Sequence, residues 1–257
     1  MHALQRAVSL GAHALELDVH QTADGHLVVC HDATLERTTP GNGRIADHTL
    51  DEIRQLDNAY WWSPGYEAIV GLEEGDYPMR GRYPSDTAFG IATLAEVLDA
   101  FPACFLNFDI KDTAPEVEPY ETKLADVLRA YERRDDVIVA SFHDDALTAF
   151  REAAPEIHTS FGIGESLAAF ERLSNGLDVG PLPSQVALQI PPAYGKFRLT
   201  APLVDRIHHA GLAVHIWTID APEEMHALLD YGVDGIMTDC PSVLTAVLNE
   251  RGLGWSG

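Results

Sequence analysis

Two carboxylates and a histidine lie close together near the start of the sequence, in the stretch LELDVHQTADGHLVVCHD (residues 15–32). Glu16 and Asp18 are one residue apart in an apolar run, so a β-strand would direct both side chains to the same face. Two carboxylates on one face repel each other unless a divalent cation joins them, and oxygen ligands suit Mg²⁺ or Ca²⁺. His31 ends the next apolar run and offers an imidazole for proton transfer near neutral pH.

A third carboxylate and a lysine occur in the later run LNFDIK, residues 106–111. Asp109 can supply a further metal ligand, and Lys111 faces the same way two residues on. The lysine can bind an anionic group or pair with a carboxylate. Residue types alone leave other interpretations open: the carboxylates can form a polar cluster without a metal, and a lone histidine is more often a core or loop residue.

Short apolar runs alternate with amphipathic segments along most of the chain, a pattern typical of a parallel sheet covered by helices. The fold class predicted is α/β, a TIM-type (β/α)8 barrel, in which catalytic side chains stand at the carboxyl ends of the strands. Strands are expected over 14–19, 27–32, 104–111, 137–142, 157–163, 186–190, 213–220 and 235–240. Helices are expected over 93–101, 120–131, 144–154, 165–174, 200–211 and 221–232.

Two segments depart from this alternation. The link between residues 19 and 27 is too short for a parallel crossover and contains Asp24-Gly25, so it predicts a hairpin whose second arm carries His31. Residues 58–90 are rich in Gly, Pro and aromatic side chains. Long loops in compact domains are often functional, so we expect 58–90 to be a lid inserted in a single domain of residues 1–257. A purely structural excursion is the alternative.

The composition limits the possible partners. With 17 basic and 40 acidic residues the net charge is −23, which disfavours nucleic acid and anionic membranes.

No apolar run approaches the ~20 residues that span a bilayer. The start of the chain lacks the apolar core of a signal peptide, and three widely spaced cysteines favour a reducing compartment. We therefore expect a cytoplasmic protein, with a signal sequence ahead of a lost first segment as the open alternative.

The order of these motifs resembles the glycerophosphodiester phosphodiesterase family of the phosphatidylinositol-phospholipase-C-like barrel superfamily. Residues 15–57 resemble its most diagnostic block, with a Glu-x-Asp, a Thr-x-Asp-Gly turn, a His-Asp and an Arg-Thr-Thr. LNFDIK resembles the strand that carries a metal ligand, and SFH the following one. The closing stretch HIWTIDAPEEMHALLDYGVDGIMTDCP matches the family's Trp-Thr and Gly-Val-Asp-Gly-Ile-x-Thr-Asp-x-Pro signature.

The resemblance implies metal-dependent hydrolysis of a glycerophosphodiester to glycerol 3-phosphate and an alcohol. It makes Glu16, Asp18 and Asp109 the ligands of one divalent cation, Mg²⁺ or Ca²⁺, and His31 one of two catalytic histidines. Lys111 becomes the basic residue beside the metal, and Trp217 a wall of the substrate pocket. On packing alone, Trp217 would more often be a structural residue. The implied partner is a small-molecule substrate.

Two departures from the family pattern lead to further expectations. The family has Glu at the position of Asp109, which is one methylene shorter. No His-Arg-Gly and no Pro-Glu-Asn segment occurs in the 257 residues, and ALQRAVSLGA (3–12) predicts a helix with no preceding strand. We expect a barrel with about seven of its eight strands, truncated at the N-terminus and with impaired activity. A non-catalytic metal- or phosphodiester-binding barrel and a related phospholipase-type phosphodiesterase are the alternative functions.

Overall fold

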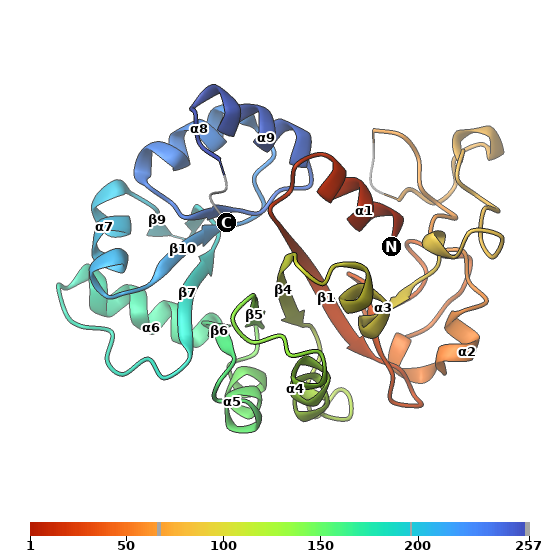
Figure 1. Cartoon of the computed structure of the whole chain (residues 1–257), viewed down its shortest axis with the longest axis horizontal. Helices are drawn as coiled ribbons and strands as arrows, with labels where there is room; N and C mark the ends of the chain where they lie inside the picture. The colour runs from red at the N-terminus through yellow and green to blue at the C-terminus, as the bar shows by residue number, and fades with distance from the viewer. Residues whose placement is uncertain (66–67, 196, 255–257) are drawn as a thin grey trace.

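The computed structural model describes residues 1–65, 68–195 and 197–254, and it has the alternating architecture that the sequence predicts (Figure 1). The strands are β1 Ala14–Gln21, β2 Leu27–Val29, β3 Ala92–Thr93, β4 Phe105–Ile110, β5 Val137–Ala140, β6 His158–Ser160, β7 Gln185–Ile190, β8 Ala193–Tyr194, β9 Phe197–Arg198, β10 Ala213–Ile216 and β11 Gly235–Ile236. The α-helices are α1 His2–Ser9, α2 Leu50–Ile53, α3 Leu94–Ala100, α4 Glu121–Ala130, α5 Asp144–Ala153, α6 Ile163–Ser174, α7 Ala201–His209, α8 Pro222–Tyr231 and α9 Pro241–Glu250.

The main sheet has the strand order β11-β10-β7-β6-β5-β4-β1-β2-β3. Within the described ranges, seven of these strands pair in parallel: β1, β4, β5, β6, β7, β10 and β11. They form an arc with helices on its outer side (Figure 1). The predicted α/β barrel with about seven parallel strands is therefore confirmed.

Side-chain alternation on β1 and β4 separates the core from the interior of the arc. Leu15, Leu17 and Val19 pack in one hydrophobic cluster with Leu106 and residues of the covering helices α3, α4 and α5. The residues between them, including the predicted metal ligands, face the other way. In register, Glu16 lies beside Asn107 and Asp18 beside Asp109. This pairing places polar side chains from two strands next to each other inside the arc.

The predicted hairpin is present. β2 pairs antiparallel with β1, matching Val19 with Val29 and Gln21 with Leu27. Gly25 has φ +82° in the turn, a conformation that glycine adopts without the steric cost of a Cβ. The backbone N–H of Cys30 donates to the carbonyl of Asp18 at 3.0 Å, so the hairpin carries the chain to His31 alongside the acidic part of β1.

The two ends of the arc meet through helices. No ladder joins β11 to β1 among the residues that the structure describes. The hydroxyl of Thr245 in α9 donates instead to the carbonyl of Leu10, after α1, at 2.9 Å. Gly11 has φ +97°, and a Cβ there would lie 2.8 Å from the Thr245 hydroxyl oxygen. Glycine is therefore required where α9 approaches the end of α1.

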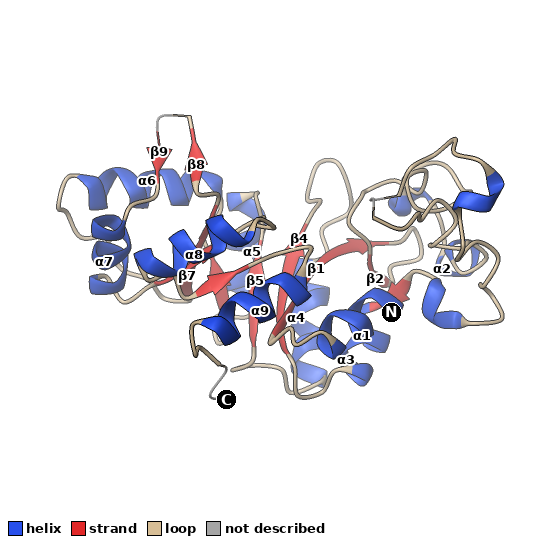
Figure 2. Cartoon of the chain, turned by 90° about the horizontal axis from the view of Figure 1, so that it is seen from above, coloured by secondary structure: helices blue, strands red, loops and turns tan. Residues whose placement is uncertain are grey.

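The described residues between 58 and 90 lie at one end of the arc, near α1 (Figures 1 and 2). There the His2 ring of α1 stacks on Phe89 with ring centres 4.7 Å apart. The described part of this segment contains two 3-10 turns, η2 Glu74–Asp76 and η3 Thr87–Phe89. Its aromatic side chains pack on one another and on Arg80, whose guanidinium lies 3.9 Å from the Tyr77 ring centre and 4.2 Å from that of Tyr60. The described part of the segment is thus held together by its own side chains, and its role as a lid stays a prediction.

Several elements were not predicted, namely the short β3, the β8–β9 hairpin, α2 and the closing helix α9. Helix α9 begins with Pro241 and has apolar residues at 243, 244 and 247, a spacing that could have revealed it. No helix in the described part of the chain is long and apolar enough to cross a membrane.

Candidate active site

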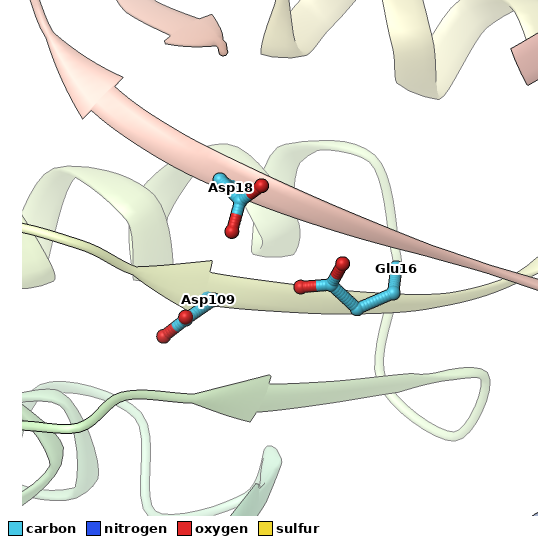
Figure 3. Close-up of side chains that lie close together, drawn as sticks. All are labelled: Glu16, Asp18 and Asp109. Carbon is cyan, nitrogen blue, oxygen red and sulfur yellow. The ribbon is translucent and has the colours of Figure 1, made fainter. Parts of the chain in front are cut away.

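Three carboxylates converge inside the arc. Glu16 and Asp18 extend from β1 and Asp109 from the neighbouring β4, and their carboxyl groups point into one space (Figure 3). One oxygen from each lies within 4.8 Å of the others. Asp18 and Asp109 are buried, and Glu16 keeps contact with solvent. The sequence prediction that these residues lie together is borne out in their placement.

Without a cation, electrostatic repulsion among the three carboxylates raises the free energy of the folded protein. The pKa of Glu16 is raised to about 8. The largest cause is the loss of bulk water around its carboxyl group, and the negative charges of Asp18 and Asp109 add to it. Burial raises the pKa of Asp109 as well. One oxygen of Asp109, Oδ1, is buried and has no hydrogen-bond partner among the residues that the structure describes. A buried acceptor without a partner costs free energy, so this oxygen is suited to an additional ligand.

Lys111 lies between two of the carboxylates. Its Nζ is 2.8 Å from Asp18 Oδ1 and 3.1 Å from Asp109 Oδ2. Burial alone would lower the pKa of Lys111, but the charges of Asp109 and Asp18 outweigh it and raise that pKa. The lysine is therefore a fixed positive charge at the cluster. Both roles considered for it, pairing with a carboxylate and binding an anion, remain compatible with this position.

His31 belongs to a short chain of polar contacts beside the cluster. Its Nδ1 lies 2.7 Å from Asp32 Oδ1, and Arg37 donates to both oxygens of Asp32 at 2.6 and 2.9 Å. The Arg37 guanidinium, assisted by His31, lowers the pKa of Asp32 to about 2. Asp32 is thus a permanent anion that orients the imidazole, while the side chain of His31 stays 68% exposed.

Trp217 follows β10 and packs edge-on against Phe142, with ring centres 5.5 Å apart. Phe142 follows β5, and its ring centre lies 5.7 Å from Lys111 Nζ. Both aromatic rings also line an apolar pocket between α6, β7 and α7. Trp217 is therefore linked to Lys111 through Phe142, and its role as a wall of the substrate pocket stays a prediction.

A polar layer below the cluster includes two residues that the sequence reasoning missed. Gln189 Nε2 donates to Asn107 Oδ1 at 2.8 Å and lies 3.2 Å from His215 Nδ1. Burial lowers the pKa of His215, which favours its neutral form. Asn107 and His215 stand two residues before Asp109 and Trp217, so the same alternation that identified the site pointed to them.

Other polar residues at the strand ends have structural roles or act at a distance. Ser141 Oγ donates to the carbonyl of Ile110 at 2.7 Å and accepts from the N–H of His143, so it holds β5 against β4. Asp239, which follows β11, adds a negative charge that contributes to the raised pKa of Glu16. The positive charge of a protonated His143 favours ionised Asp109.

The donor set fits a hard divalent cation. Three carboxylates, one with a free buried oxygen, are the ligands that Mg²⁺ and Ca²⁺ prefer, and a cation would relieve the repulsion that raises the pKa of Glu16. Waters would complete the coordination. The arrangement therefore suits chemistry on an anionic, oxygen-rich substrate.

The chain is similar to known proteins over most of its length. Residues 1–243 match the model of the Glycerophosphoryl diester phosphodiesterase family. The glycerophosphodiester phosphodiesterase of Caldanaerobacter subterraneus subsp. tengcongensis is 32% identical over 252 residues, which cover 97% of this chain and 91% of that protein. That of Bacillus subtilis is 30% identical over 251 residues, covering 95% of this chain and 79% of the relative.

Solved structures share the fold. A glycerophosphodiester phosphodiesterase from Agrobacterium tumefaciens superposes with a TM-score of 0.71 at 22% identity, covering 94% of this chain and 90% of the other. A phosphodiesterase from Oleispira antarctica, solved with its product sn-glycerol-3-phosphate, gives 0.71 at 23% identity and covers 96% and 90%. With residues 1–243 matched by the family model, this chain belongs to the glycerophosphoryl diester phosphodiesterase family.

Proposed function

We propose that this chain hydrolyses glycerophosphodiesters to glycerol 3-phosphate and an alcohol, with one divalent cation, Mg²⁺ or Ca²⁺, held by Glu16, Asp18 and Asp109. The observation that carries the proposal is the convergence of these three carboxylates, one of which, Asp109, has a buried oxygen with no hydrogen-bond partner among the described residues. The relatives named glycerophosphodiester phosphodiesterase, at 32% and 30% identity, support the reaction class.

Each residue has a distinct role in this proposal. A bound cation would neutralise charge on the phosphate oxygens. Lys111, already charged beside Asp18 and Asp109, would bind a further phosphate oxygen. His31, oriented by Asp32, would transfer a proton through its other nitrogen. Trp217 would contact the glycerol or the leaving alcohol.

The proposal extends to the whole chain. Residues 1–257 act as a single domain, and 58–90 serve as an inserted lid over the mouth of the barrel. The cysteines Cys30, Cys104 and Cys240 are free, which is compatible with a reducing cytoplasm. The net charge of −23 disfavours nucleic acid as a partner.

Product identification tests the reaction class. The 257-residue chain is incubated with glycerophosphocholine and Mg²⁺ or Ca²⁺, and ³¹P NMR follows the phosphorus-containing products. Glycerol 3-phosphate is expected, at a low rate, because the sequence contains no His-Arg-Gly segment. Phosphocholine as the product would favour a different phosphodiesterase. Metal-dependent substrate binding with no product would favour the binding-only barrel.

A further inference from the structure

The polar layer of Asn107, Gln189 and His215 has no role in the function proposed above. These side chains come from β4, β7 and β10. Because β5 and β6 separate β4 from β7 in the sheet, the 2.8 Å hydrogen bond from Gln189 Nε2 to Asn107 Oδ1 is not part of a strand ladder. It joins two strands that are not neighbours. Buried polar connections of this kind hold their members in one arrangement.

His215 sets the direction of the hydrogen bonds in the polar layer. Burial lowers the pKa of His215, which favours a neutral imidazole with one donor and one acceptor nitrogen. Nδ1 faces the amide nitrogen of Gln189 at 3.2 Å, so Nδ1 accepts and the proton is on Nε2. Gly235 pairs with His215 across β10 and β11, and a Cβ there would lie 2.9 Å from the ring atom Cδ2. The ring therefore has no room to shift toward β11.

The amide of Asn107 is oriented in turn. Its Oδ1 accepts from Gln189, so its nitrogen Nδ2 faces away from Gln189 and keeps two N–H groups for other partners. Nδ2 donates to none of the residues that the structure describes. Asn107 is only 6% exposed, and a largely buried donor without a partner costs free energy. This nitrogen is therefore suited to an acceptor inside the arc.

Glu16 is a neighbouring acceptor that lacks a donor. It lies beside Asn107 in the β1–β4 register, and neighbouring strands are about 4.8 Å apart, a separation that an asparagine amide can span. Lys111 contacts the other two carboxylates of the cluster, Asp18 and Asp109. The Glu16 carboxylate accepts no hydrogen bond from the described residues. An unpartnered donor and an unpartnered acceptor thus stand on adjacent strands.

We propose that Asn107 is a positioning residue for Glu16. Its Nδ2, directed by Gln189, donates to the Glu16 carboxylate and holds it where it can bind the cation. This inference rests on the cation site proposed above. A neutral amide suits the task, because it orients the carboxylate without adding a positive charge that would repel the cation. Hydrogen-bond partners of metal ligands typically change metal affinity by ~10–100-fold.

The tautomer of His215 tests the direction of the polar layer in the unaltered protein. With the proton on Nδ1 instead, the Gln189 and Asn107 amides would both turn over. Glu16 would then face the Asn107 oxygen, a second acceptor. Long-range ¹H–¹⁵N NMR spectra distinguish the two tautomers by the shifts of the ring nitrogens. We expect the Nε2–H form, and the Nδ1–H form would overturn the proposal.

Metal affinity tests the effect on Glu16. Isothermal titration calorimetry with Mg²⁺ and with Ca²⁺ compares the parent 257-residue chain with Asn107→Leu and Gln189→Met, which remove the polar groups at similar volume. Both variants should bind metal about tenfold more weakly. The double variant should bind no more weakly than Asn107→Leu, because both residues act through one hydrogen bond to Glu16. Fully additive losses would contradict this route.

Ser184→Ala is the matched control. Ser184 is buried and directly precedes β7, at the opposite end of the strand from Gln189, and its hydroxyl donates to the carbonyl of Pro155 at 3.1 Å. Loss of this hydrogen bond should lower stability in urea, as Gln189→Met also should, but it should leave metal affinity unchanged. Equal weakening of metal binding by both variants would show that the polar layer acts only through stability.

The Glu16→Gln background separates this inference from the proposed function. It removes the carboxylate that Asn107 would orient, so adding Asn107→Leu to it should not weaken metal binding further. A parent protein that binds metal no more tightly than Asn107→Leu would refute the positioning role and leave the proposed function intact. A parent protein that binds neither Mg²⁺ nor Ca²⁺ would refute the cation site itself.

Discussion

The ammonium group of Lys111 lies 2.8 Å from Asp18 and 3.1 Å from Asp109, two of the three carboxylates in the candidate cation site. From the sequence, pairing with a carboxylate and binding an anion were alternative roles for Lys111. Its position is compatible with both. The lysine stabilises the ionised carboxylates of Asp18 and Asp109, and in the function that we propose it also binds a phosphate oxygen.

Replacing the lysine should therefore affect metal and substrate in opposite directions. In Lys111→Met the positive charge that opposes a second cation is lost, so Mg²⁺ or Ca²⁺ should bind several-fold more tightly. The KM for glycerophosphocholine should rise, because an anion-binding group is gone. Calorimetry and initial-rate kinetics measure the two effects. Weaker metal binding in this variant would contradict the charge argument.

Glu16 makes the stability of the metal-free protein depend on pH. Its pKa of about 8 lies above the usual value, so folding favours the protonated acid, and ionisation costs stability. Glu16→Gln, which cannot ionise, should match the parent protein below about pH 4.5 and become progressively more stable than it up to about pH 8. Urea denaturation in EDTA from pH 4 to pH 9 follows this difference.

Saturating Mg²⁺ or Ca²⁺ provides the control for that experiment. If Glu16 is a ligand, metal should remove the advantage of Glu16→Gln at pH 8–9, because the cation stabilises the ionised carboxylate only in the parent protein. An advantage that persists unchanged in metal would show that Glu16 does not bind it.

Asp32 gives a pH dependence of the opposite sign. Its pKa of about 2 lies below the usual value, so ionised Asp32 stabilises the fold above about pH 4, and this stabilisation is lost as the pH falls through 2. Arg37→Met should destabilise the protein at pH 7 by less than about 1 kcal/mol, because the pair is partly exposed. The difference should shrink toward pH 2 in urea denaturation, and a constant difference would contradict this origin.

The sequence predicted those features that follow from local alternation. Leu15, Leu17 and Val19 pack in the core, so Glu16 and Asp18 had to face inward, and the same rule placed Asp109 beside Asp18. Asp24-Gly25 predicted the hairpin that brings His31 to the end of β2. These features depend on strand period and turn chemistry, which a single sequence carries.

The features that were missed depend on contacts between distant segments. Asn107 and His215 are joined through Gln189 in one polar layer from three strands. Alternation places both residues on the inner face, but it does not show which strands meet there. An apolar pocket lined by α6, β7, α7 and the β8–β9 hairpin is a second such feature, and Phe170 of α6 meets Phe197 of the hairpin edge-on there. In the sequence, the apolar spacing on α6 predicts a helix face that packs against the core. It gave no sign that this face would line an open pocket instead.

The central claim is that Glu16, Asp18 and Asp109 hold the cation required for phosphodiester hydrolysis. The most direct test is release of glycerol 3-phosphate from glycerophosphocholine by the 257-residue chain, titrated with Mg²⁺ and Ca²⁺ after EDTA treatment, for the parent protein and for Asp18→Asn. Leu177→Asp, an exposed site outside the cluster, serves as the control. We expect turnover only with metal, about 10²-fold or more weaker in Asp18→Asn at the same metal concentration. Equal turnover in EDTA, or an Asp18→Asn variant as active as the parent protein, would contradict the claim.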